Sequence, residues 1–185
     1  MKISYIILII LIGILLYYET KHYSTTNQIA KFDNKKYIVR NEDDKQEAAE
    51  LLALMKNKSN KLIQGLIRDY PSNKNIIKLN MKFKTTDIYE TTYKKNYTSY
   101  SLNKGDAIYL CLRNINNTLH NENTIFFVMM HELAHIMTDD WEHSPEFWKN
   151  FKLLTSNAIK YNLYNYINYN KYPQSYCGIK INTTP

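Results

Sequence analysis

The chain begins with an uninterrupted apolar run, after which apolar and polar positions alternate. Residues 3–18 hold no charged side chain. As a helix they would span about 24 Å, slightly less than the roughly 30 Å hydrocarbon core of a bilayer. A cleaved signal peptide would need small residues at the end of the run, where Leu16, Tyr17 and Tyr18 stand instead. We therefore interpret residues 1–20 as an uncleaved single-pass transmembrane anchor.

The segment that follows the apolar run is polar. Residues 21–41 show no apolar periodicity and are predicted to be a linker. More lysines follow the apolar run than precede it, so the positive-inside rule leans toward a cytosolic domain. Residues 42–185 are then predicted to form one domain, because a chain of this length can bury a single core.

Helical patterns open this domain and strand patterns follow them. Residues 41–58 begin acidic, end in lysines and carry an apolar face, and a second helix is predicted before Pro71. A third short helix is predicted to begin at Ser72. Residues 82–93 and 106–113 are rich in β-branched and aromatic residues and predict strands. A turn at 103–105 precedes the second strand, and the whole order predicts an α+β fold.

Residues 122–137 are predicted to form the central buried helix. Apolar side chains cover nearly its whole circumference, which is typical of a helix enclosed on all sides. After Thr124 its only polar side chains are those of His131, Glu132 and His135. Burying these three groups without partners would cost several kcal/mol, so something must satisfy them.

The three polar residues form an HExxH pattern, and a zinc ion would satisfy them. Histidines four residues apart project from one helix face and can offer ring nitrogens to one metal ion at about 2.0 to 2.1 Å. Glu132 is rotated by about 100° from His131, so its carboxylate lies beside the metal, where it can deprotonate a zinc-activated water. We predict one Zn2+ ion, with His131 and His135 as ligands and Glu132 as general base.

The charge of the chain changes this picture only slightly. A net charge of +7 is common among nucleic-acid-binding proteins. However, the 24 basic residues include only three arginines, and the lysines are spread along the chain. A nucleic-acid partner is therefore possible but not favoured.

Three stretches, in this order, resemble the WLM (Wss-like) metallopeptidases, above all the single-domain members encoded by large DNA viruses: TSYSLNKGDAIYLCLRN, HELAHIMTDDWEHSPEFWKNF and YPQSYCGIKI. The resemblance covers about residues 42–185. It implies a zincin-like fold, one zinc ion held by three histidines, and peptide hydrolysis with a glutamate base. By position these roles fall on His131, His135, His143 and Glu132. A viral origin would place the anchor in a host or virion membrane.

The third zinc ligand can also be argued from the residues themselves. Several side chains follow the helix closely enough to reach the metal: Asp139, Asp140, Glu142, His143 and Glu146. Ser144 and Pro145 make a strong helix start, which fixes His143 at a rigid junction. The aspartates lie at a fraying helix end, and Glu146 suits a helix N-terminus. We therefore predict His143.

Other polar and reactive residues leave alternatives open. Cys111 and Cys177 can form a disulfide, or Cys177 can approach the zinc, but we expect two buried free thiols. His120 is expected at the surface or at a helix cap. The tyrosine-rich residues 161–172 are expected to form a last helix and its exit. A tyrosine near the zinc would stabilise an oxyanion.

Together these patterns predict a membrane-anchored zinc endopeptidase acting on proteins or peptides, with residues 106–113 as the edge strand that pairs with an extended substrate. Two alternatives remain. A DNA-associated protease that acts on DNA–protein crosslinks is favoured by the charge and opposed by the anchor. A non-catalytic, zinc-stabilised binding module would have no need of Glu132. The sequence gives no prediction of the oligomeric state.

Overall fold

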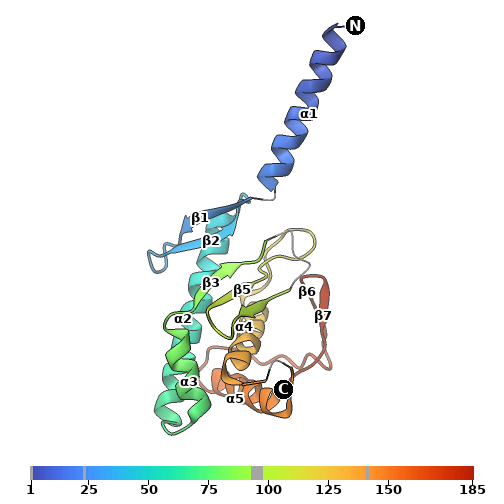
Figure 1. The fold of residues 1–185 in the computed structure, drawn as a ribbon. Helices are drawn as coiled ribbons and strands as arrows, with labels where there is room; N and C mark the ends of the chain where they lie inside the picture. Colours follow the sequence, from blue (N-terminus) through green and yellow to red (C-terminus); the bar gives the residue numbers. More distant parts are fainter. Residues whose placement is uncertain (1, 23, 93–97, 141) are drawn as a thin grey trace.

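Helix α4 (Glu122–Met137) runs through the body of the protein (Figure 1). The structure is a computed structural model that describes residues 2–22, 24–92, 98–140 and 142–185. Helices α2, α3 and α5 and strands β4 and β5 all pack against α4. The mixed α+β fold and the buried central helix predicted from the sequence are confirmed.

Helix α1 (Lys2–His22) stands away from this body in Figure 1, with side chains described from Tyr5 to Tyr17. Within the described part of the chain, no helix combines the length and the apolar character needed to cross a membrane. The predicted transmembrane anchor, and the single-pass membrane localisation derived from it, are therefore wrong.

A two-stranded antiparallel hairpin occupies the segment for which the sequence predicts a linker. It consists of β1 (Thr25–Ile29) and β2 (Lys36–Arg40). The Glu50 carboxylate of α2 accepts hydrogen bonds from the backbone N–H groups of residues 31 and 32, at 2.6 and 3.0 Å. These contacts attach the hairpin to the body.

The helices after this hairpin differ from the predicted ones in their number and start. Helix α2 (Lys45–Asp69) is continuous where two helices were predicted, because its polar middle contains neither proline nor glycine to break it. Helix α3 (Lys74–Phe83) is capped by Asn73 rather than Ser72: the Asn73 side chain accepts hydrogen bonds from the backbone of Asn75 and Ile76.

The three-stranded sheet has the order β3–β5–β4. β3 (Asp87–Glu90) runs parallel to β5 (Ala107–Leu110), and β4 (Tyr100–Leu102) runs antiparallel to it. Both predicted strands are confirmed over shorter ranges; residue 93, at the end of the first, lies outside the described residues. Because β5 is central, the predicted edge role of residues 106–113 is wrong. The predicted turn at 103–105 is confirmed by positive φ angles at all three positions.

The chain ends in a small hairpin rather than a last helix. Helix α5 (Pro145–Lys160) stops before the tyrosine-rich run, in which Tyr164 and Tyr169 are buried against Phe127. The expectation of a helix there is wrong. β6 (Gln174–Tyr176) and β7 (Ile179–Ile181) then form an antiparallel pair.

A disulfide between Cys111 and Cys177 ties this last hairpin to the end of β5. The prediction of two free thiols is wrong, because the fold brings together two cysteines that are 66 positions apart. His120 lies beside the disulfide rather than at the surface or a helix cap. It is half-buried, and its Nε2 accepts a hydrogen bond of 3.2 Å from the Cys177 N–H.

The disulfide closes a long loop, so it should contribute strongly to stability. For a separation of 66 residues, the restriction of the unfolded chain corresponds to about 4 kcal/mol. We predict that a Cys111→Ser, Cys177→Ser double variant loses about this much unfolding free energy in urea titrations. Reductant should lower the stability of the wild type and leave that of the double variant unchanged. Equal stability of oxidised and reduced wild-type protein would contradict this prediction.

Candidate metal centre

Three histidines from two parts of the chain converge on one point. His131 and His135 lie on one face of α4, and His143 comes from the segment between α4 and α5. The Nε2 atom of His131 lies 3.2 Å from that of His135 and 3.1 Å from that of His143. Among the described residues, potential ligand atoms of these three lie within 4.8 Å of one another, and no carboxylate joins the group.

This spacing fits a zinc ion. Nitrogens bound tetrahedrally at 2.0 to 2.1 Å from one zinc ion lie about 3.3 Å apart, close to the separations observed. The His143 side is exposed, which leaves a fourth position accessible to solvent or substrate. The arrangement therefore suits a catalytic type of zinc site, which keeps one position open.

The start of α5 fixes the third histidine. The Ser144 side chain caps the helix by accepting a hydrogen bond from the Phe147 N–H, and Pro145 occupies the first turn. The buried Phe147 ring lies 4.9, 4.5 and 4.6 Å from the rings of His131, His135 and His143. One aromatic side chain thus packs against all three imidazoles, and the helix start predicted at Ser144 and Pro145 is confirmed.

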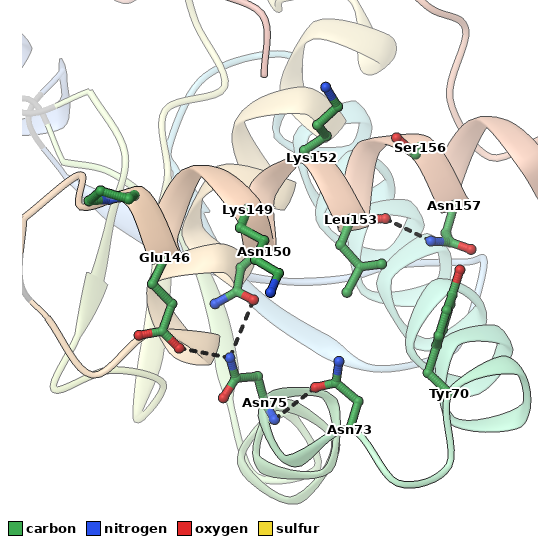
Figure 2. A pocket seen from close by; sticks show the side chains of 11 residues that line it. Tyr70, Asn73, Asn75, Glu146, Lys149, Asn150, Lys152, Leu153, Ser156 and Asn157 are labelled. Atoms are coloured by element: carbon green, nitrogen blue, oxygen red, sulfur yellow. Dashed lines mark hydrogen bonds between the residues drawn. The ribbon is translucent and has the colours of Figure 1, made fainter.

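A chain of amide hydrogen bonds supports the same junction from the other side of α5. Asn150 donates to the Thr138 hydroxyl at 3.0 Å, which joins α5 to the end of α4. Figure 2 shows how Asn75, at the start of α3, reaches both Glu146 and Asn150, at 2.9 and 3.4 Å. These contacts hold α3, α4 and α5 together behind the histidines, beside a surface groove that Figure 2 outlines.

Glu132 lies next to the histidines but not among them. Its side chain is buried, and burial raises the pKa of its carboxyl group to about 8. The backbone N–H of Ser101, in β4, donates a hydrogen bond that partly opposes this shift. A cation in the histidine cluster would favour the carboxylate further. The position beside the cluster is the one predicted for Glu132.

The carboxylates considered as third ligands are committed elsewhere or lie outside the cluster. Asp139 pairs with Lys78, and Glu146 bonds Asn75. Asp140 lines the cleft in front of the histidines, yet neither it nor Glu142 belongs to the converging group. The geometry thus brings together the three predicted histidines and leaves the carboxylates out. The role of the three histidines as metal ligands stays a prediction.

Sequence reasoning assigned no role to three side chains at the site, namely those of Lys104, Ser99 and Tyr176. Lys104 donates to the Thr138 and Asp139 carbonyls at the end of α4, and its charge adds to burial and His143 in lowering the pKa of His135. Tyr176 is buried, with its hydroxyl group 2.8 Å from that of Ser99 and 2.7 Å from the Cys111 carbonyl. The signal that could have found them is the family resemblance, because Tyr176 lies in the quoted stretch YPQSYCGIKI, and Ser99 and Lys104 lie in TSYSLNKGDAIYLCLRN.

Two cavities meet at the histidines. A cleft of about 340 Å³ lies between β4 and the cluster, lined by residues 98–101 and Lys104. A second cavity of about 300 Å³ extends toward the C-terminal hairpin. Both are lined by His131, Glu132 and His143, so they open onto the same chemical groups.

Comparison with known proteins assigns the family. A family model described as the WLM domain matches residues 45–182. The chain belongs to the WLM domain family. The resemblance seen in the sequence is confirmed, and this WLM membership indicates a zinc metallopeptidase-like function.

Viral proteins are among the relatives of this WLM chain. An uncharacterized protein of Acanthamoeba polyphaga mimivirus is 33% identical over 183 residues, covering 95% of this chain and 93% of that protein. An uncharacterized protein of Invertebrate iridescent virus 3 is 42% identical over 50 residues, which is 26% of this chain and 31% of that protein. An uncharacterized protein of Invertebrate iridescent virus 6 is 32% identical over 69 residues, which is 36% of this chain and 38% of that protein. No solved structure matches.

The histidines give the metal-free protein an acid sensitivity of defined sign. Burial, then His135 and His143, lower the pKa of His131 to about 3. Burial, then His143 and Lys104, lower the pKa of His135 to about 4. In the unfolded chain both titrate near 6.5, so the unfolded state binds more protons as the pH falls from about 6.5 toward 4. The two histidines should therefore lower the unfolding free energy across this window, against a smaller opposite contribution from the raised pKa of Glu132.

Urea titrations of the full chain in chelator, at several pH values, measure this decrease. A His131→Asn variant removes one of the two groups, so its unfolding free energy should depend less steeply on pH. Identical pH dependence in wild type and variant would show that His131 titrates normally in the folded protein.

Proposed function

We propose that the chain is a zinc-dependent endopeptidase in which His131, His135 and His143 hold one zinc ion and Glu132 is the general base. The observation that carries this proposal is the convergence of three imidazoles beside a buried carboxylate in a solvent-accessible cleft. Family membership supports the same reaction class. The substrate is proposed to be a protein or peptide.

Each group has a defined part in peptide hydrolysis. A bound zinc ion would supply Lewis acidity and lower the pKa of a coordinated water. Glu132 takes a proton from the attacking water and delivers it to the leaving amine. The Ser101 backbone N–H favours the carboxylate form of Glu132, which is the form that accepts the proton.

Strand β4 is the element we propose to align the substrate. Among the described residues β4 pairs within the sheet only with β5, so an extended peptide would lie along its other edge. Residues 98–101 line the cleft in front of the histidines. A peptide paired along β4 would therefore pass beside Glu132. This replaces the earlier assignment of the edge role to residues 106–113.

Substitution of the base should separate metal binding from catalysis. Because Glu132 lies beside the cluster without joining it, Glu132→Gln should keep zinc and lose most hydrolysis, by at least about a hundredfold, as expected for loss of a general base. The measurement is proteolysis of a denatured protein mixture, together with zinc content from elemental analysis. Full proteolysis by a zinc-loaded Glu132→Gln protein would overturn the assignment of Glu132 and show that another group acts as the general base. Zinc binding without proteolysis by the wild type would favour the non-catalytic module.

Substitution of the third histidine tests the ligand set. His143→Ala should weaken zinc binding by orders of magnitude because it removes one of three protein ligands. Glu142→Ala is the matched control, since its exposed side chain is adjacent in sequence but outside the cluster; its zinc affinity should stay within about tenfold of the wild type. Competition titrations with a chelating dye measure both. A wild-type affinity in His143→Ala would exclude this histidine as a ligand.

A further inference from the structure

The cavity toward the C-terminal hairpin, here called the hairpin pocket, has one end formed by the proposed reaction centre. His131, Glu132 and His143 line that end. From there the pocket extends between α4, α5 and the β6–β7 hairpin. Its volume of about 300 Å³ lies at the lower end of the range for ligand pockets, about 300 to 1,000 Å³. A side chain of a peptide bound at the histidines can therefore enter it.

The register of the β6–β7 hairpin decides which of its side chains face the pocket. Residues paired across antiparallel strands lie on the same face, so Tyr176 and Ile179 share a face, as do Gln174 and Ile181. Tyr176 bonds Ser99 and Gln174 bonds Thr124 of α4, so this is the inner face. Ile179 and Ile181 therefore point toward α4 and the pocket.

The opposite wall is apolar as well. Phe127 and Val128 come from α4, and Trp148 and Phe151 from α5. Val128 and Trp148 are only partly buried, and Ile179 remains 52% exposed although it lies on the inner face. Apolar side chains thus face one another across the pocket without filling it.

Several contacts hold the hairpin wall in place. The Cys111–Cys177 disulfide fixes its turn, and His120 bonds the Cys177 backbone. The buried Tyr176 ring packs against His120, with ring centroids 4.8 Å apart. A wall attached through β6 and at the turn can keep a defined shape, which a selective pocket requires.

We propose that the hairpin pocket is a specificity pocket that receives a large apolar side chain from one of the two residues flanking the cleaved bond. This inference rests on the proposed peptidase function and narrows its substrates. Because the walls of the pocket are apolar, charged side chains are disfavoured there, and Ile179 and Ile181 act as specificity-determining residues.

The first test compares cleavage of a degenerate peptide library by three zinc-loaded, full-length proteins: the wild type, Ile181→Glu and Ser175→Glu. Ser175 is exposed on the outer face of the same hairpin, so Ser175→Glu is a charge-matched control. The wild type and Ser175→Glu should prefer Phe, Leu or Met at one flanking position. In Ile181→Glu this preference should fall about tenfold or more, and acceptance of Lys should rise.

Ile179→Glu provides a second variant, because its partly exposed position tolerates a charge if Ile181→Glu does not fold. It should show the same loss of apolar preference. Cleavage without side-chain preference in the wild type, or an unchanged preference in both pocket variants, would overturn the proposal while leaving the peptidase function intact.

The second test measures binding without hydrolysis. Labelled alanine hexapeptides with one central Phe or one central Asp are titrated against the zinc-loaded Glu132→Gln protein. The Phe peptide should bind at least about tenfold more tightly, and Ile181→Glu in this background should abolish the difference. If the wild type hydrolyses nothing yet this difference is present, the pocket stands and the peptidase proposal fails. Equal affinity for both peptides would overturn the pocket.

Discussion

The burial of α4 is the constraint on which the site depends. This helix is enclosed by α2, α3, α5 and the sheet, so its histidines and Glu132 must find polar partners inside the body. Unpartnered, such groups would cost several kcal/mol. The fold meets this requirement at one place: His143 completes the cluster, and the Ser101 backbone reaches Glu132. Charge, polarity and solvent access are thereby concentrated at a single point of a helix that is otherwise apolar after Thr124.

Elements far apart in the sequence cooperate to hold that point. The α4–α5 junction supplies His143 and the Phe147 ring, and the Asn75–Asn150–Thr138 chain supports it from behind. On the other side, Tyr176 links the C-terminal hairpin to Ser99, close to the β4 backbone that touches Glu132. The hairpin therefore serves two purposes. It supports the strand beside the proposed base and forms one wall of the hairpin pocket.

The sequence predicted those parts of the site whose signals are local. The HExxH spacing and the apolar circumference of α4 lie within one helix, and the Ser144–Pro145 start that fixes His143 follows directly. Interactions between distant residues left no such signal: the Cys111–Cys177 disulfide and the Ser99–Tyr176 bond depend on tertiary packing. The short strands of the first hairpin, with five residues each, carry too little periodicity to separate them from a linker. The central place of β5 is set by pairing order, which strand composition does not encode.

Zinc X-ray absorption spectroscopy of the full-length, zinc-loaded protein tests the central claim most directly. The account predicts three imidazole nitrogens and one further light atom at about 2.0 to 2.1 Å, with no sulfur. The spectrum should be the same in the Glu132→Gln variant, because Glu132 lies beside the cluster rather than in it. Fewer than three imidazoles, or a coordination shell that changes with Glu132, would contradict the account.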